Sequence, residues 1–403
     1  MKPHFVTTQQ ARMLQTACDT LAQMIDRVVN LYFHDPVIRD VFSLSPEAEE
    51  LVRIDPGYAR SAVISRLDCF LDGESLKFME FNCDSPAGMG YADCVENILL
   101  QVEELKDFFN ELHLRRVNRA EALLKVLLEV YEEFGAYETP QIGIIDWKTV
   151  RTKPEFELLK RSFEEKGYKT VIADPRDLKL RGGKLYHGGF RIDLVYRRAI
   201  FSELLDRLRD VGDFIKAYRD RAVCVVNPLR SRIASSKALL SIFTNPGYDY
   251  LFSAGENKIK WDHIPWTRRV LDAEKFYGGK KIYLIDFLKD EKETLVLKPA
   301  DSYGGKDVSL GCETRDEDWN RAIDQALKGN WVVQEFVRFP IFSVPVIVNN
   351  KIEFTLKKVN TGHFVFGGSS VSGFSRLSDD SVINVSRGGG LIPALVCEGE
   401  IFG

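Results

Sequence analysis

The sequence lacks a long apolar run, a strong excess of one charge and an N-terminal targeting signal. Its 403 residues include 55 Lys and Arg against 59 Asp and Glu, so the formal net charge is only −4. This balance provides no basic field that would attract nucleic acid. No segment reaches the length of a membrane span, and the first 15 residues have no secretory cleavage pattern. We therefore expect neither nucleic acid nor a membrane among its partners.

Paired cysteines and the common nucleotide or metalloprotease motifs are also missing. The seven cysteines form no CxxC pair and are widely scattered, at positions 18, 69, 83, 94, 224, 312 and 397. Such spacing argues against a zinc site and against a disulfide framework, so we expect a cytoplasmic protein. The sequence contains no HExxH, no GxGxxG and no GxxxxGK[ST]. A zinc protease, a dinucleotide fold and a P-loop are therefore not indicated.

Apolar periodicity predicts helices in the first third of the chain. Apolar residues recur at intervals of three and four over residues 7–33, 91–109 and 116–134. Ser45 is a plausible N-cap for a further short helix, because Ser accepts a hydrogen bond from the first turn. The apolar stripe of residues 7–33 is expected to face a core rather than a ligand.

Strands alternate with helices in the middle of the chain and become dominant later. Between residues 140 and 226 the alternation predicts a parallel α/β unit. Later strands are expected at residues 294–298, 307–310, 331–334, 344–348 and 351–358. The length is typical of two or three domains, and we place their bounds at residues 1–135, 140–226 and 227–403.

Residues 63–84 carry the most informative polar pattern, on two strands joined by a polar turn. Residues two apart on a strand share a face, so Arg66 lies with Asp68, and Glu80 lies with Asn82. Pairing Asp68 with Glu80 also places Arg66 opposite Asn82. That register predicts a three-residue loop, Gly73-Glu74-Ser75, and puts Asp72 opposite Leu76.

The four polar residues of this predicted hairpin form a candidate Mg²⁺ site. Opposed residues are about 5 Å apart at Cβ, so Asp68, Glu80 and Asn82 could share one hard cation. Mg²⁺ prefers oxygen ligands, usually one or two carboxylates together with phosphates and water. The alternative is an exposed hairpin with a surface network of Arg, Asp and Glu.

A strand lysine and a glycine loop form the second candidate element. Lys298 ends a predicted strand, and Gly304 and Gly305 precede Lys306. Glycine lets backbone N–H groups approach phosphate oxygens, and lysine supplies a positive charge. A GGK sequence also occurs in ordinary hairpin turns, but the nearby strand lysine favours two cations that grip different phosphates.

The third candidate element is the strand at residues 332–337. Gln334 and Glu335 end this apolar strand, where backbone groups could meet the edge of an adenine base. An ordinary edge strand explains the same residues equally well.

These elements together resemble the ATP-grasp enzymes, and specifically the circularly permuted branch that includes glutathionylspermidine synthase. The resemblance covers about residues 60–390, and its matching residues are Arg66-Leu67-Asp68, Glu80-Phe81-Asn82, Asp84-Ser85-Pro86, Lys298, Lys306, Gln334-Glu335 and the segments 190–198, 226–240 and 384–390. In ordinary ATP-grasp chains the acidic strands follow the lysines. Here they precede them by more than 200 residues, which is the permuted order.

The resemblance implies a mixed fold, α+β with α/β parts. A permuted ATP-grasp fold would hold its nucleotide in a cleft between two α+β lobes. Residues 1–135 would then contribute N-terminal helices and the metal-binding hairpin, and residues 140–226 a small Rossmann-like parallel unit, the pre-ATP-grasp unit. Residues 227–403 would supply the lid and the remaining core.

The resemblance also implies an ATP-dependent carboxylate–amine ligase that works through an acyl phosphate and releases ADP and phosphate. Its cofactors would be ATP and Mg²⁺, with the metal on Asp68, Glu80 and Asn82. Arg66 would be the catalytic arginine, which stabilises the transferring phosphoryl group. Nucleotide contacts would come from Lys298, Lys306, Gly304, Gly305, Gln334 and Glu335. The partners would be a small-molecule or peptide carboxylate and an amine acceptor.

Several alternatives remain open at the level of sequence. The same scaffold would suit a small-molecule kinase. A non-catalytic nucleotide-binding protein is a third hypothesis. The chain lacks the amidase half of bifunctional glutathionylspermidine synthases, and their substrate-binding residues have no match here, so glutathione and spermidine do not carry over. Neither the oligomeric state nor the roles of Arg376, Asn384 and Arg387 follow from the sequence.

Overall fold

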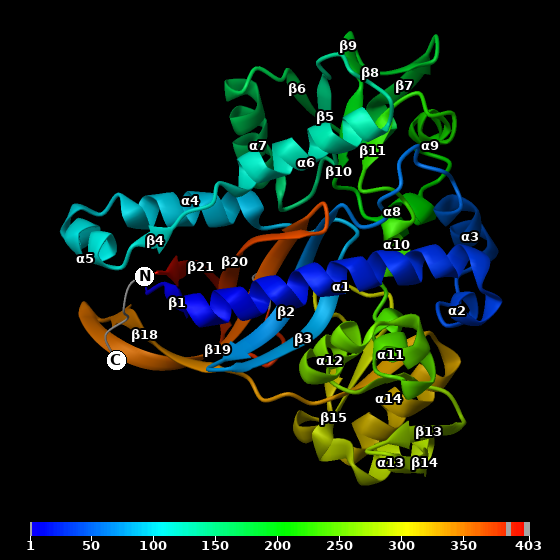
Figure 1. The fold of residues 1–403 in the computed structure, drawn as a ribbon, viewed down its shortest axis with the longest axis vertical. Coiled ribbons are helices and arrows are strands. Elements are labelled where there is room, and N and C mark those ends of the chain that lie inside the picture. The colour runs from blue at the N-terminus through cyan, green and yellow to red at the C-terminus, as the bar shows by residue number, and fades with distance from the viewer. Residues whose placement is uncertain (1, 384–387, 399–403) are drawn as a thin grey trace.

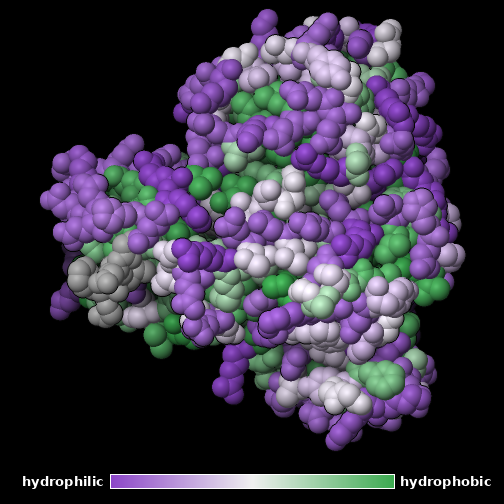
Figure 2. Space-filling view, viewed as in Figure 1, coloured by the Kyte–Doolittle hydropathy of each residue, from purple (hydrophilic) through white to green (hydrophobic). Residues whose placement is uncertain are grey.

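The computed structural model describes residues 2–383 and 388–398, which form a mixed α+β fold. The long helix α1 (Thr8–His34) crosses the middle of the molecule (Figure 1). It begins at a capping box in which Thr7 and Gln10 satisfy each other's backbone N–H groups. Its apolar stripe is buried as the sequence predicts, and the face of the molecule seen in Figure 2 is largely hydrophilic.

The largest sheet joins the two ends of the chain. Among the described residues it has eight strands, in the order β1-β21-β20-β19-β2-β3, with β18 beside β19 and β4 beside β21. The bounds are β1 His4–Thr7, β2 Ile64–Asp72, β3 Ser75–Asn82, β4 Leu114–Arg115, β18 Ile341–Val348, β19 Lys351–Phe366, β20 Ser369–Ser378 and β21 Gly390–Cys397. The early hairpin β2–β3 therefore pairs directly with a strand from the last part of the chain, and α1 packs against β19 and β20.

A second sheet is parallel throughout, as expected from the alternation of strands and helices. Its strand order in the described chain is β11-β10-β5-β6, with β5 Ile142–Ile145, β6 Thr170–Ala173, β10 Leu194–Arg197 and β11 Cys224–Val226. Helices α6 (Arg119–Glu133) and α7 (Lys153–Glu165) contact it. A small antiparallel sheet follows β6, made of β7 Leu178–Arg181, β8 Lys184–His187 and β9 Phe190–Ile192. The description of this region as a Rossmann-like unit stays a prediction.

A third sheet is formed by strands from residues 267–335. Its described strands run β12-β17-β15-β16, with β12 Thr267–Arg269, β15 Leu295–Pro299, β16 Ser309–Leu310 and β17 Trp331–Glu335. Helices α13 (Leu284–Asp290) and α14 (Asp316–Lys328) share its core cluster. Nearby lie α10 Ser231–Ser235, α11 Ala238–Phe243, α12 Ala254–His263 and the hairpin of β13 Glu274–Tyr277 and β14 Lys280–Tyr283.

The remaining helices are short and connect these layers. They are α2 Pro36–Asp40, α3 Pro46–Val52, α4 Met89–Leu100, α5 Lys106–Glu111, α8 Phe201–Asp206 and α9 Gly212–Arg219. Ser45 caps α3 as predicted, because its side chain accepts a hydrogen bond from the Ala48 N–H. No helix within residues 2–383 and 388–398 combines the length and apolarity needed to cross a membrane.

The single helix predicted over residues 91–109 is wrong. The structure divides it into α4 and α5, with Val102 in an extended conformation between them. The break turns Phe109 and Leu112 onto Leu395 of β21, in a small cluster of their own. Burial of these side chains outweighs the continuation of the helix, a tertiary effect that local periodicity does not reveal.

The hairpin β2–β3 keeps the predicted pairs but closes with a different turn. Asp68 faces Glu80 and Arg66 faces Asn82, which confirms the register of the polar residues. The turn has two residues rather than three, and Asp72 faces Ser75 rather than Leu76. A β-bulge at Met79 takes up the extra residue, since the register shifts by one after Asp68.

Candidate functional site

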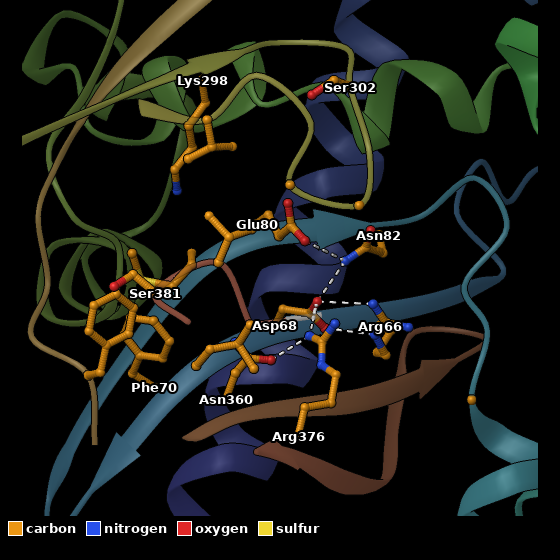
Figure 3. Close-up of a pocket in the computed structure, with 18 of the residues that line it drawn as sticks. Arg66, Asp68, Phe70, Glu80, Asn82, Lys298, Ser302, Asn360, Arg376 and Ser381 are labelled. Carbon is orange, nitrogen blue, oxygen red and sulfur yellow. Dashed lines mark hydrogen bonds and ion pairs between the residues drawn. The ribbon is translucent and has the colours of Figure 1, made fainter. Parts of the chain in front are cut away.

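The β2–β3 hairpin and the end of β15 face each other across a cavity of about 600 Å³ (Figure 3). One side is formed by polar residues of the hairpin, and the other by Lys298 and the loop that carries Gly304 and Gly305. Residues of β19, β20 and the segment 381–383 close a third side. The fold thus brings together segments that are more than 200 residues apart.

Asp68 stands at the centre of an ion cluster on the cavity floor. It is only 1% exposed, and Arg66 binds it with two hydrogen bonds, from Nε to Oδ1 at 2.7 Å and from Nη2 to Oδ2 at 3.0 Å. Arg376 of β20 donates to Oδ2 at 2.6 Å and also to the side chain of Asn360 in β19. Burial opposes the charge on Asp68, but the two guanidinium groups outweigh it and lower its pKa to about 2.

The absence of a side chain at Gly362 makes room for this cluster. Gly362 pairs with Asp68 across β19 and β2. A Cβ atom at that position would lie 2.9 Å from Cδ of Arg66 and 3.1 Å from Oδ1 of Asp68. The strand therefore requires glycine because of close approach by a neighbouring side chain, not because of a special backbone angle.

Glu80 and Asn82 extend the polar face from Asp68 toward the open cavity. The amide of Asn82 donates to Oδ2 of Asp68 at 3.0 Å and to Oε1 of Glu80 at 3.3 Å. Nζ of Lys237 lies 3.4 Å from the other Glu80 oxygen and donates to the backbone carbonyl of Ser302 at 2.7 Å. Lys237 thus ties the hairpin to the glycine loop.

Lys298 lies on the opposite wall, where its Nζ donates to Oε1 of Gln334 at 2.6 Å. Burial lowers its pKa to about 8, since the nearby Glu80 carboxylate only partly offsets the loss of water and Lys237 adds repulsion. A lysine held in this way keeps its charge most readily when an anion approaches it.

The cavity as a whole is rich in positive charge. Among the described residues that line it, two carboxylates, Asp68 and Glu80, face five cations, namely Arg66, Arg151, Lys237, Lys298 and Arg376. Apolar side chains, including Val296, Leu310, Phe336 and Phe339, cover the wall near Lys298. A ligand that suits this lining has a polyanionic part and a flat or apolar part.

Some residues predicted from the sequence do not line the cavity. Lys306 is exposed on the loop, and its carbonyl accepts a hydrogen bond from Ser302. Gln334 is 1% exposed and holds Lys298 and Thr267 by its side chain. Strand β17 pairs on both sides, so Gln334 and Glu335 are not on an edge strand.

Lys237 and Asn360 were not predicted from the sequence, and Arg376 had no predicted role. Arg376 belongs to the Asp68 cluster, whereas Asn384 and Arg387 lie outside the described residues. Asn360 interrupts the late part of β19 with a polar side chain among buried residues, and this could have marked it. Lys237 follows two serines before α11 and carries no comparable signal.

The residues present suit a hard cation only in part. Glu80 and Asn82 face the cavity and offer oxygen atoms, which is the chemistry that Mg²⁺ prefers. Both oxygens of Asp68 already accept hydrogen bonds from arginine. Across the part of the chain that the structure describes, no group of three or more His, Cys, Asp or Glu side chains could hold a metal ion. A site on these residues therefore depends on Glu80 and Asn82 more than on Asp68.

Comparison with known protein families shows which family this chain belongs to. The glutathionylspermidine synthase pre-ATP-grasp family matches residues 2–352. The chain belongs to this family. The match includes the hairpin β2–β3, Lys237, Lys298 and the glycine loop, and it ends before Asn360 and Arg376. The comparison with curated proteins gives no match.

Two solved structures are similar to this family member. A glutathione synthetase-like effector from Globodera pallida has 10% sequence identity and a TM-score of 0.62, over 98% of this chain and 89% of that one. A putative gamma-glutamylcysteine synthetase from Methylobacillus flagellatus has 12% identity and a TM-score of 0.45, over 95% and 87%. At such identity the first likeness shows a common fold.

Proposed function

We propose that the protein is an ATP-dependent carboxylate–amine ligase. The observation that carries the proposal is the meeting of an early acidic hairpin and a late lysine across one cation-rich cavity. Membership of the synthase family supports it. The fold would then be a permuted ATP-grasp fold, with residues 140–226 as its Rossmann-like pre-ATP-grasp unit, residues 1–135 carrying the hairpin and residues 227–403 the lid.

Each wall of the cavity has a part in holding ATP. Lys298 and Lys237 bind phosphate oxygens, and backbone groups of Gly304 and Gly305 approach the same phosphates. Lys306 joins them when the loop folds over the nucleotide. Gln334 and Glu335 contribute by fixing Lys298 and the segment that follows, so that Phe336 and Val337 contact the adenine ring.

The reaction joins a carboxylate to an amine in two steps. A carboxylate oxygen attacks the γ-phosphorus, the bond to the β-phosphate oxygen breaks, and ADP leaves. The amine nitrogen then attacks the acyl carbon, loses a proton and expels inorganic phosphate. Arg66, fixed by Asp68, neutralises the transferring phosphoryl group, and Arg376 supports it from β20, on the far side of β19.

The reaction needs no catalytic triad, because positioning and charge neutralisation dominate phosphoryl transfer. Closure of the loop at Gly304 and Gly305 excludes water from an acyl phosphate that water would destroy. When Mg²⁺ is bound by Glu80 and Asn82, with Asp68 beside them, it supplies charge neutralisation for the phosphates.

The substrates are a small-molecule or peptide carboxylate and an amine acceptor. A second candidate function is a small-molecule kinase, since the same cavity would transfer the γ-phosphoryl group to an acceptor that keeps it. The two differ in their products. Ligation releases ADP only when both carboxylate and amine are present, whereas a kinase leaves a stable phosphorylated acceptor.

The test is ADP release from Mg·ATP with a panel of carboxylates, with and without a panel of amines. The proposal predicts a pair that releases ADP and forms an amide. Substitution Glu80→Gln should lower that turnover by orders of magnitude and leave the fold intact, because the cavity loses its most available carboxylate. Unchanged turnover in this variant would refute the metal assignment, and a phosphorylated acceptor would favour the kinase.

A further inference from the structure

The loop of residues 83–88, which leads into α4, forms a wall of the cavity and supplies a third hydrogen bond to Arg66. Ala87 and Gly88 line the cavity. The backbone carbonyl of Ala87 accepts a hydrogen bond from Nη1 of Arg66 at 2.7 Å. Asp68 holds Nε and Nη2 of this guanidinium, and the loop holds the remaining nitrogen, Nη1, so the position of the loop helps to set how Arg66 is oriented.

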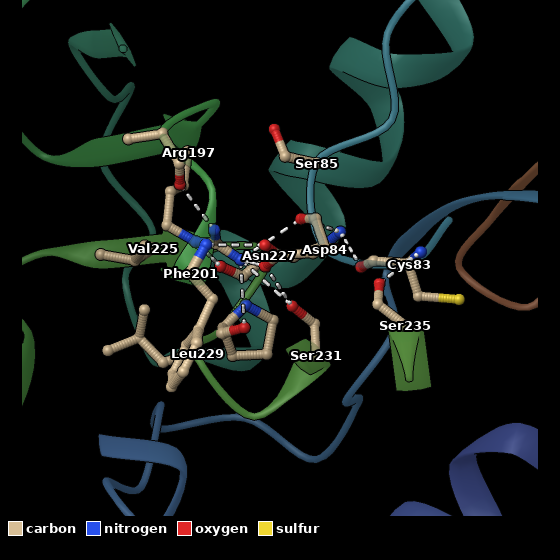
Figure 4. A network of polar contacts seen from close by, with 12 residues as sticks. Cys83, Asp84, Ser85, Arg197, Phe201, Val225, Asn227, Leu229, Ser231 and Ser235 are labelled. Atoms are coloured by element: carbon tan, nitrogen blue, oxygen red, sulfur yellow. Dashed lines mark hydrogen bonds and ion pairs between the residues drawn. The ribbon is translucent and has the colours of Figure 1, made fainter. Parts of the chain in front are cut away.

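The beginning of this loop is fixed by a buried polar network (Figure 4). The Asp84 carboxylate accepts hydrogen bonds from Nη2 of Arg197 at 2.5 Å and from the backbone N–H of Phe201 at 2.7 Å. Asn227 donates to the carbonyl of Cys83 at 2.8 Å. Ser85 donates to the carbonyl of Arg198 at 2.6 Å. This end of the loop therefore does not depend on the cavity.

The other end is held by one side chain from a different helix. Glu155, in the first turn of α7, is 1% exposed. Its Oε1 accepts hydrogen bonds from the N–H groups of Gly88 at 2.8 Å and Gly90 at 3.0 Å. Its Oε2 is buried without a hydrogen-bond partner in the described structure.

A buried carboxylate costs folding free energy when one of its oxygens lacks a hydrogen-bond partner. Its presence therefore calls for an explanation. Burial raises the pKa of Glu155, although Arg198 and the two N–H groups oppose the shift. Glu155 does not line the cavity, so it does not act on a ligand directly. Its contacts lead instead through Gly88 to the adjoining Ala87 carbonyl and from there to Arg66.

We propose that Glu155 is a positioning residue that sets the orientation of Arg66 through the backbone of residues 87–90. The inference rests on the proposed function, because it gives Arg66 the role of stabilising a transferring phosphoryl group. The loop is held through two hydrogen bonds that Oε1 of Glu155 accepts, so an acceptor at this position should hold it; the Glu155 charge also attracts Arg198 and Arg66. Gln retains a carbonyl oxygen that can accept both bonds, and Ala does not.

The test compares the binding of two nucleotide mimics by calorimetry, so that no substrate is needed. Mg·AMP-PNP reports binding of the ground state, and Mg·ADP with aluminium fluoride mimics the phosphoryl group in transfer. Substitution Glu155→Ala should weaken the aluminium fluoride complex by about tenfold to 100-fold, since misplacement of a catalytic group by about 1 Å can cost about 100-fold. The affinity for Mg·AMP-PNP should stay within about twofold, and Glu155→Gln should restore both values.

A matched control is Asp193→Ala, which removes another buried carboxylate that accepts a backbone N–H, from Gln141 at 3.0 Å. Asp193 does not line the cavity, so both affinities should stay at wild-type values. If Glu155→Ala fails to fold, Gly90→Ala takes its place. The added Cβ would lie 3.1 Å from Cγ of Glu155, and the same selective loss is expected.

The outcomes separate this inference from the proposed function. A wild-type protein that binds neither mimic contradicts the proposed function. A wild-type protein that gains nothing from aluminium fluoride contradicts the role of Arg66 and this inference with it. Wild-type affinity in both Glu155→Ala and Gly90→Ala overturns the inference alone. So does equal weakening of both mimics, which would indicate a purely structural residue.

Discussion

At the scale of residues, one buried carboxylate organises two arginines from opposite ends of the chain. Asp68 holds Arg66 from its own strand and Arg376 from β20. An isolated carboxylate at that depth would be neutral, because removal from water costs more than a single surface contact returns. Two guanidinium groups keep it ionised, and in return it fixes both of them at the cavity.

Lys298 should make the proposed binding of a polyphosphate depend on pH. Burial lowers its pKa to about 8, and lysine carries its charge below its pKa. The affinity for Mg·AMP-PNP should therefore be highest below pH 8 and fall about tenfold by pH 9. Calorimetry at several pH values checks this. In the variant Lys298→Arg the decrease should disappear, since arginine stays charged; an unchanged decrease would assign it to another group.

Strand alternation was enough to predict which polar residues meet in the hairpin. Arg66, Asp68, Glu80 and Asn82 were placed on one face from their spacing alone, and their register is confirmed. Lys237 could not be predicted in this way. It reaches Glu80 from the N-terminal end of α11. The two residues are 157 positions apart, and a local sequence pattern cannot predict such a contact.

At the scale of elements, β19 is the strand that joins the early hairpin to the late part of the sheet. It pairs with β2 on one side and with β20 on the other. Gly362 lies where the Arg66–Asp68 pair crosses it. The strand thus serves as a platform whose one missing side chain leaves space for the ion cluster.

Substitution Gly362→Ala should destabilise the fold by about 1–3 kcal/mol, because the new Cβ overlaps packed atoms of Arg66 and Asp68. Urea unfolding at pH 7 measures the loss. Gly189→Ala serves as the control, since no atom lies within 4 Å of its added Cβ. Equal stability of the two variants would show that Arg66 and Asp68 can move aside without cost.

Element types were easier to predict than their ends. The alternation of strands and helices indicated the parallel sheet of β5, β6, β10 and β11, and the structure contains it. The bulge at Met79, within the hairpin, and the break after α4 were missed. The break places Phe109 and Leu112 against β21, the last strand of the described chain. Local patterns cannot weigh such contacts against an unbroken strand or helix.

At the scale of the whole molecule, the cavity unites three parts of the chain that no short segment could bring together. The hairpin, the end of β15 and strand β20 each contribute a charged residue. A ligand that contacts all three stabilises the folded state over the unfolded chain. The proposal of a permuted ATP-grasp fold rests on the order of these parts in the sequence.

Saturating Mg·AMP-PNP should therefore raise the melting temperature. A ligand at about 100 times its Kd adds about 2.7 kcal/mol, which corresponds to a shift of about 3 °C for a chain of this size. Thermal unfolding followed by fluorescence measures the shift. Lys298→Ala should reduce it, and an equal shift in that variant would place the nucleotide elsewhere.

The central claim is that this cavity binds ATP with its γ-phosphate between the hairpin and Lys298. The most direct measurement is a crystal structure of the protein with Mg²⁺ and AMP-PNP. We expect the terminal phosphate within hydrogen-bond distance of Arg66 and Lys298, with Mg²⁺ beside Glu80. A nucleotide bound outside the cavity, or a terminal phosphate remote from Arg66, would contradict the claim.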